Sequence, residues 1–161
     1  THHLAGELFK LQSRTDMAHV PYTGAGPMLL ALMGDQVNLA FDGLGSSAQH
    51  IRSGKIKAIA VAAPQRSAAF PDVPTASEAG LPGYEVSTWY GIFAPKGTPK
   101  EAVDRMGAEL RKPLDTPELK KTWLANGSDT PRYTQPEFAT YLQSEVQRWR
   151  KVSQDAGVKA D

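Results

Sequence analysis

The sequence contains no cysteine, no long apolar run and no block of like charges. Without cysteine the protein forms neither disulfides nor thiolate metal sites, and it has no cysteine nucleophile. Because no stretch approaches the roughly 18–20 apolar residues that cross a bilayer, we expect no membrane-spanning segment. A formal net charge of +1 gives no reason to expect nucleic acid or an anionic membrane as a partner.

Common catalytic motifs are also missing, since the chain has no HExxH, no Walker loop and no GxSxG elbow. Asp42, Ser46 and His50 could be drawn as a catalytic triad, but one short segment does not enforce triad geometry. A hydrolase using Ser46 and His50 therefore stays open as an alternative. The adjacent His2 and His3 point to different faces of a helix, so they are not expected to share a metal. We expect no catalytic residue, no metal and no cofactor.

The beginning of the chain has neither an initiator methionine nor a signal peptide. Thr1 falls in the first turn of a helix that the leucine spacing predicts over residues 1–12. This indicates that the sequence starts inside a longer protein. Its 161 residues are enough to bury a core and would ordinarily make one domain, or two small ones.

The most informative stretch is residues 19–27, His-Val-Pro-Tyr-Thr-Gly-Ala-Gly-Pro. It joins a short expected strand at 17–20 to an apolar helix at 28–33. A loop that opens into a helix leaves backbone N–H groups unpaired at the helix start, and the helix dipole adds partial positive charge there. The loop is therefore suited to holding an anion such as a carboxylate. For Tyr22 and Thr23 the alternative interpretation is packing within the loop.

The same arrangement recurs with a strand at 37–41, a Gly/Ser loop at 42–47 and a helix from residue 48. Two strand–loop–helix units with both loops at the carboxyl ends of strands predict a ligand site at that edge of a sheet. Asp42 and Ser46 lie in this second loop. For Asp42 the alternative is a structural role as a helix N-cap or loop brace.

Further along the chain, apolar and aromatic residues predict strands at 55–62 and 84–94, so strands alternate with helices as in an α/β fold. The capping box Thr75-Ala-Ser-Glu78 predicts a short helix that ends near Gly80. Three more helices are expected at 98–114, 116–126 and 134–155. Apolar spacing predicts that the first buries Val103, Met106 and Leu110, and that the last buries Phe138, Leu142, Val146 and Trp149.

Several of these motifs together resemble one family. They include His-Leu-Ala-Gly-Glu-Leu-Phe-Lys at 3–10, the stretch at 19–27, Phe-Asp-Gly-Leu at 41–44, Pro-Asp-Val-Pro-Thr at 71–75 and Ala-Pro-Lys-Gly-Thr-Pro at 94–99. The chain is similar, over essentially its whole length, to the Bug proteins, the TctC-type solute receptors of tripartite tricarboxylate transporters. The resemblance implies a periplasmic-binding-protein-like (type II) fold, whose two lobes close like a Venus flytrap around a small carboxylate. It also implies an exported, periplasmic protein that hands its ligand to the membrane permease subunits of the transporter.

The resemblance further implies that the fold is incomplete. Residues 1–87 match most of the second lobe without its first strand, and residues 88–161 match the crossing strand and C-terminal helices of the first lobe. Hinge motion is expected near residues 87–91. The expected ligand is a di- or tricarboxylate or an acidic amino acid, and a ligand-sensing receptor for a signalling system is the alternative function. The expected ligand-binding residues are Thr1, Tyr22, Thr23, Gly24, Ala25, Gly26, Asp42 and Ser46.

Overall fold

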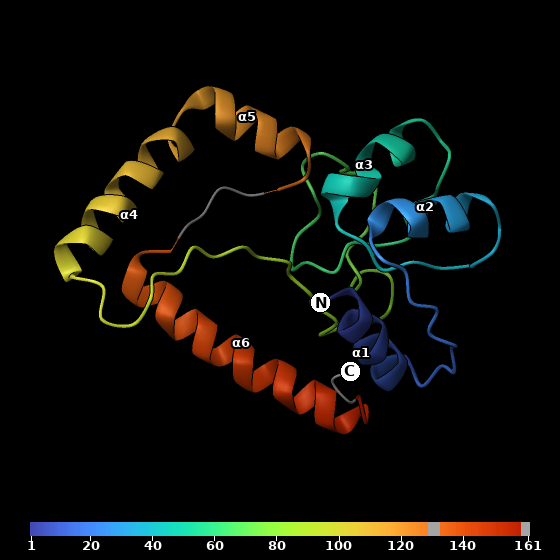
Figure 1. The fold of residues 1–161 in the computed structure, drawn as a ribbon. Coiled ribbons are helices and arrows are strands. Elements are labelled where there is room, and N and C mark those ends of the chain that lie inside the picture. The colour runs from blue at the N-terminus through green and yellow to red at the C-terminus, as the bar shows by residue number, and fades with distance from the viewer. Residues whose placement is uncertain (129–132, 159–161) are drawn as a thin grey trace.

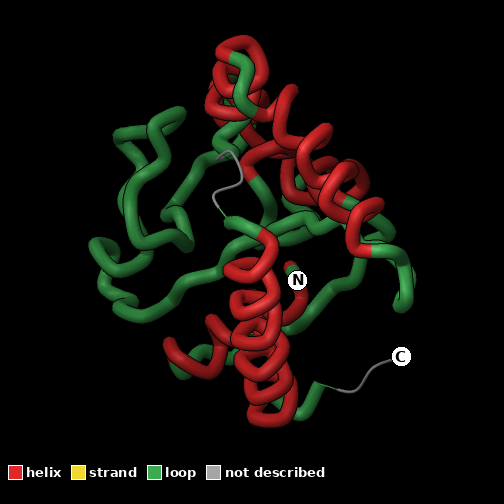
Figure 2. Tube along the Cα trace, turned by 90° about the vertical axis from the view of Figure 1, so that its left-hand side faces the viewer, coloured by secondary structure: helices red, strands yellow, loops and turns green. Residues whose placement is uncertain are grey.

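The computed structural model describes residues 1–128 and 133–158, and in these ranges all the regular secondary structure is helical (Figures 1 and 2). Six helices are connected by long loops and extended segments. The helices are α1 (His2–Ser13), α2 (Ala25–Met33), α3 (Leu44–Arg52), α4 (Lys100–Leu114), α5 (Pro117–Ala125) and α6 (Gln135–Asp155).

Six of the predicted helices form, two of them beginning earlier than expected, whereas the short helix predicted after Thr75 does not form. The predicted helix at 28–33 begins at Ala25, and the helix expected from residue 48 begins at Leu44. Gly24 and Gly43 are the extended residues that precede these helix starts. Some glycines and serines that the sequence places in loops lie in the first turns of α2 and α3. At Gly26 and Gly45 no other atom lies close enough to obstruct the helix.

The predicted strands do not form a sheet in the described residues. The one β feature found there is an isolated parallel bridge between Val61 and Thr75. It is supported by hydrogen bonds from the Val61 amide to Pro74 O and from the Ala76 amide to Val61 O, each 2.9 Å long. The expectation of strands at 17–20, 37–41, 55–62 and 84–94 is wrong in this respect, although Val61 of the third segment takes part in the bridge. Apolar alternation favours extended backbone, but a strand also needs a neighbour with which to exchange hydrogen bonds.

The main core lies where α1 packs against the second half of α6. Its buried residues are Leu8, Ala76, Tyr84 and Val152, so it joins four distant parts of the chain. The Tyr84 hydroxyl donates a buried hydrogen bond of 3.0 Å to the carbonyl oxygen of Ala5. Burial raises the pKa of Tyr84 to about 12. The hydroxyl therefore stays protonated and keeps donating at physiological pH.

Helices α4 and α5 form a corner that leaves apolar residues exposed. Met106 on α4 is 58% exposed and Val146 on α6 is 48% exposed, so the prediction that both face the core is wrong. Leu110 and Trp149, from the same predicted stripes, are half-buried. Among the described helices, α4 packs against α5. Helix α5 provides too little apolar surface to cover the apolar face of α4.

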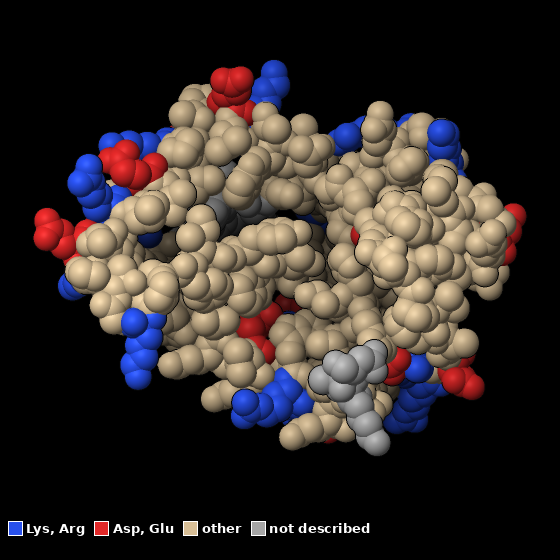
Figure 3. Space-filling view, in the orientation of Figure 1, with Lys and Arg blue, Asp and Glu red and all other residues tan. Residues whose placement is uncertain are grey.

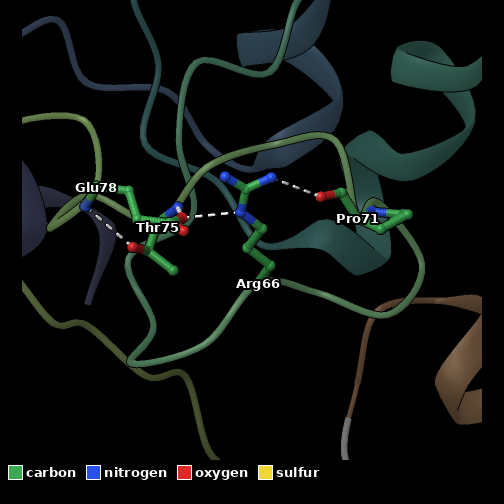
Figure 4. Close-up of polar contacts among 4 residues, drawn as sticks. All are labelled: Arg66, Pro71, Thr75 and Glu78. Atoms are coloured by element: carbon green, nitrogen blue, oxygen red, sulfur yellow. Dashed lines mark hydrogen bonds and ion pairs between the residues drawn. The ribbon is translucent and has the colours of Figure 1, made fainter.

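A loop at residues 66–78 is held by a polar brace in place of the short predicted helix (Figure 4). The predicted capping box forms, because the Thr75 amide donates to Glu78 Oε2 over 2.8 Å and the Glu78 amide donates to Thr75 Oγ1 over 3.1 Å. Only turns follow it. Arg66 completes the brace by donating to Glu78 Oε2 over 2.8 Å and to the carbonyl oxygen of Pro71 over 3.0 Å.

Candidate ligand-binding site

The first turns of α1 lie against the two extended segments that lead into the predicted ligand loops. The His3 ring stacks on the His19 ring, with centroids 3.9 Å apart and planes 7° from parallel. A Cβ added to Gly6 would lie 3.4 Å from Cδ2 of Phe41. His19 precedes the loop at 21–24 and Phe41 precedes Asp42. Helix α1 thus positions both loops, a role that sequence spacing could not reveal because these partners lie far apart in the chain.

The first loop presents unpaired backbone donors to solvent. Thr23, Gly24 and Gly26 are exposed, and Tyr22 and Ala25 are half-buried. Within the described residues, no hydrogen bond is made by the amides at 23–26, and the first bond of the helix runs from the Met28 amide to Gly24 O at 3.4 Å. The N–H groups at 23–26 have no acceptor in the part of the chain that is described, and no acidic side chain in the first turn offsets the partial positive charge of the helix dipole at the start of α2. This end of the helix therefore has the properties of an anion-binding site.

The second loop places a carboxylate beside the start of α3. Ser46 Oγ donates to Asp42 Oδ2 over 2.7 Å and lies 3.0 Å from the carbonyl oxygen of Gly43. Asp42 Oδ1 is shielded from solvent and has no hydrogen-bond partner in the described structure. Gly43, and not Asp42, is the N-cap of α3. Asp42 therefore keeps one buried acceptor oxygen that no group of the described structure satisfies.

The contacts of Ser46 do not assemble a catalytic triad. Its hydroxyl contacts Asp42 and Gly43, and within the described residues no hydrogen bond joins it to His50. A nucleophilic serine needs its base within hydrogen-bond reach. No group of three or more His, Asp or Glu side chains in the described ranges is arranged to hold a metal ion.

Thr1 lies at the start of α1, where it is the exposed N-cap residue and its side chain makes no capping bond. Its carbonyl oxygen accepts from the Ala5 amide over 2.9 Å. Helices α2 and α3 pack against each other, and in Figure 1 both begin on the side that faces the middle of the molecule. The three predicted groups of site residues therefore lie at the starts of three helices, two of which are in direct contact.

His19 is the titratable group with a shifted pKa that precedes the first loop. The pKa of His19 is lowered, chiefly by partial burial and then by the neighbouring His3. Most charged side chains lie around the edge of the face seen in Figure 3, with lysines and arginines mixed among acids. The first loop itself carries no Lys or Arg at 22–26, so the donors it offers are backbone N–H groups and the hydroxyl groups of Tyr22 and Thr23.

Two hollows on the surface are lined by other residues. One, of about 540 Å³, lies at 51–58 and Val73. The other, of about 310 Å³, lies between α4 and the start of α6. Neither hollow is lined by a predicted ligand-binding residue. In the described ranges, no helix combines the length and the apolar character that crossing a membrane requires.

Comparison with known proteins identifies the family to which this chain belongs. A family model described as "Tripartite tricarboxylate transporter family receptor", TctC, matches residues 1–158. The structure superposes on R. palustris Rpa4515 with adipate, at 32% identity and a TM-score of 0.88, covering 97% of this chain and 52% of that one. It also superposes on MatC from Rhodopseudomonas palustris with bound malate, at 35% identity and a TM-score of 0.86. The match covers 94% of this chain and 53% of MatC.

A third solved structure, the periplasmic binding protein BugD, matches at 32% identity and a TM-score of 0.88, covering 100% of this chain and 55% of that one. The chain spans about half the length of the first curated relatives it matches, 45% and 48%. The architecture is therefore part of a two-lobed binding-protein fold. These relatives are solute-binding receptors and not enzymes. The chain belongs to the TctC family of tripartite tricarboxylate transporter receptors.

Proposed function

We propose that this chain is part of an extracytoplasmic solute-binding protein that captures a small carboxylate in the periplasm and passes it to the permease subunits of a tripartite tricarboxylate transporter. The observation that carries this proposal is the exposed start of α2, where the amides at 23–26 have no partner in the described structure. Relatives that carry malate and adipate support a dicarboxylate ligand or a similar acid.

In the proposed mode of binding, a ligand carboxylate accepts hydrogen bonds from the amides of Ala25 and Gly26 and from the Thr23 hydroxyl. Thr1 contributes a further polar group from the start of α1, and ordered water fills the remaining contacts at little cost. Hydrogen bonds to a charged group contribute about 1.5–3 kcal/mol each. A few such bonds are enough for specific binding without a buried arginine.

Asp42 selects the rest of the ligand. Its negative charge attracts a ligand ammonium group, whereas a second carboxylate placed near it is repelled. The Ser46 hydroxyl holds the Asp42 side chain in place by donating to the other oxygen. The pair therefore discriminates between an acidic amino acid and a plain dicarboxylate.

We propose the division expected from the sequence, with residues 1–87 in one lobe and residues 88–161 in the other, except that the second half of α6 packs against α1 of the first group. Hinge motion at 87–91 would bring the second wall over the first loop. The open surroundings of residues 22–26 and the extended course of the chain beyond Tyr84 are consistent with this division.

Nuclear magnetic resonance on the 161-residue chain tests the site directly. Titration with malate is expected to shift the amide signals of Gly24, Ala25 and Gly26. Ala25→Pro removes one amide donor and still suits the first position of a helix, so it is expected to weaken malate binding by about tenfold to a hundredfold. Thr23→Val, which removes the hydroxyl, is expected to act in the same direction.

Lys100→Pro is the matched control, because it places proline at the first position of α4, away from the proposed site. It is expected to leave malate binding unchanged. Malate-dependent shifts confined to other segments, or equal affinity in the wild-type chain and both loop variants, would contradict the proposed site.

A further inference from the structure

We propose that Arg52 is a positioning residue that latches the end of α5 to α3 and so slows the release of a bound solute. The latch consists of two contacts, Arg52 with Ala125 and Leu44 with Gly127. It rests on the proposed function, because it acts on the opening of the same site. It goes beyond that function by assigning a role to residues that do not contact the solute.

The guanidinium of Arg52, the last residue of α3, reaches the last residue of α5. Its Nη2 donates to the carbonyl oxygen of Ala125 over 2.6 Å, although the two residues are 73 positions apart in the chain. The same guanidinium lies over the ring of Phe70, 5.0 Å from its centroid. Phe70 belongs to the loop at 66–78, which Arg66 braces. The aromatic face therefore helps to orient the guanidinium toward α5.

The end of α5 is a favourable acceptor for this cation. The carbonyl oxygens at 122–124 accept backbone hydrogen bonds from the amides at 126–128, whereas Ala125 O accepts none from the backbone of the described residues. The last turn of α5 carries no basic side chain. A helix ends in free carbonyl groups and a partial negative charge, which a cation stabilises. Arg52 therefore supplies, from another helix, the positive charge that the end of α5 lacks.

A second contact joins the other end of α3 to the turn that follows α5. Leu44 begins α3, and a Cβ added to Gly127 would lie 2.7 Å from Cδ1 of Leu44 and 2.8 Å from its Cβ. The leucine therefore rests on the backbone of Gly127. Both contacts fall on the helix whose first turn carries Ser46, the partner of Asp42 in the second loop.

No broader packing joins α3 to α5 in the described ranges. The helix pairs that pack there are α1 with α6, α2 with α3 and α4 with α5. Figure 1 shows the end of α5 beside α3 and the rest of the α4–α5 corner away from it. Arg52 and Ala125 are both exposed, so water can replace either partner. A contact of this kind contributes little free energy and can form and break readily.

The packing of α1 on α6 is different, because it includes the buried core. That junction stays intact, and hinge motion at 87–91 instead separates the α4–α5 corner from α3. The separation breaks the hydrogen bond from Arg52 to Ala125. A contact made only in the closed arrangement favours that arrangement by its own free energy. Removing it is expected to speed solute release by about three- to tenfold and to change the association rate little.

The first experiment measures the latch without any solute. Because the chain has no cysteine, Gln49→Cys on α3 and Lys121→Cys on α5 provide two unique and exposed positions for spin labels. Pulsed electron spin resonance on the 161-residue chain should give one narrow distribution of distances. Arg52→Gln should broaden it toward longer distances, and Arg52→Lys should restore part of the narrow distribution. Leu44→Ala should loosen the latch at its other contact.

Arg105→Gln is the matched control, because it removes the same charge from an exposed residue of α4. It should leave the distances unchanged. An unchanged distribution in Arg52→Gln, or an equal change in Arg105→Gln, overturns the latch. Circular dichroism should show the same helical content in both variants. Should it fall in Arg52→Gln, the distribution of Leu44→Ala decides by the same criterion.

The second experiment measures the rate at which malate leaves the chain, from nuclear magnetic resonance line shapes during the titration. Arg52→Gln should raise the dissociation rate by about three- to tenfold, with a smaller rise in Arg52→Lys. A general loss of structure would also lower the association rate, which the latch leaves nearly unchanged. Equal dissociation rates in the wild-type chain and in Arg52→Gln overturn the latch. Absence of malate binding to the wild-type chain contradicts the proposed function instead, and the distances then decide on the latch.

Discussion

Ser46 and Asp42 form a hydrogen bond of 2.7 Å across the start of α3, with the serine hydroxyl donating to Oδ2. This contact fixes the carboxylate at the start of α3 and leaves Oδ1 shielded and without a partner in the described structure. Both side chains are thereby committed to one arrangement that suits recognition of a donor group. The same contact explains why a triad cannot form, because the serine proton is directed at the aspartate.

Asp42→Asn is expected to change ligand preference. Removing the negative charge should weaken binding of aspartate and strengthen binding of malate, each by about tenfold, because a unit charge at about 4 Å contributes roughly 1–4 kcal/mol near a protein surface. Calorimetric titration of both ligands measures the two effects. Equal changes in the same direction would show that Asp42 does not face the ligand. Asp72→Asn, in the loop at 66–78, is the control.

Gly127→Ala is expected to destabilise the protein by more than Gly157→Ala. Both glycines end helices with positive φ, 71° and 65°, and each is followed by an amide that bonds back to its helix. Substitution at either position costs about 1–2 kcal/mol for the left-handed backbone. Only at Gly127 would the new Cβ also lie 2.7 Å from Leu44. The difference between the free energies of unfolding of the two variants in urea measures this steric cost. An equal loss of stability in both variants would contradict the predicted clash with Leu44.

Arg66→Gln is expected to raise the pKa of Glu78. The hydrogen bond from Arg66, followed by that from the Thr75 amide, lowers the pKa of Glu78 from 4.5 to about 2. Because the folded pKa is depressed, the contribution of this carboxylate to stability is present above about pH 4.5 and is lost as the pH falls toward 2. Carboxyl titration by nuclear magnetic resonance measures the shift, with Arg66→Lys as a partial replacement. An unchanged pKa of Glu78 in the Arg66→Gln variant would contradict the hydrogen bond from Arg66 to Glu78.

His19→Asn is expected to reduce the loss of stability in mild acid. The pKa of His19 is lowered from 6.5 by partial burial and by His3. The unfolded chain therefore takes up this proton more readily, so stability falls as the pH drops below about 6.5 and levels off below the folded pKa. The effect is small because the ring is exposed on one side. Urea unfolding between pH 5 and 8 measures it, and His2→Asn should retain the wild-type pH dependence.

Local features of the fold could be predicted from the sequence because neighbouring residues determine them. The capping boxes at Thr75 and Thr134 both form, and Asn126-Gly127 ends α5 as expected. The strands could not be predicted in the same way. Residues 84–94 have the side chains of a strand, but pairing depends on a partner elsewhere, and in the described residues only the Val86 amide forms a backbone hydrogen bond to a distant segment, at Ala62 O.

The candidate site, too, could be predicted from the sequence only in its local features. The sequence indicated both loops, yet nothing in it paired His3 with His19 or Gly6 with Phe41. The predicted burial of Met106 and Val146 was wrong because helical spacing shows which residues share a face, and not whether another element covers that face.

By itself, the sequence determined the helices, their caps, the family and the two loops with free amides, because these depend on contacts within a few residues or on motifs along the chain. Tertiary structure alone decided that α1 lies against the segments leading into both loops, that Tyr84 bonds to Ala5, and that residues 87–94 stay without backbone hydrogen bonds in the described structure. Those features depend on which distant segments meet, and hydrogen bonds and packing between distant segments leave no local pattern.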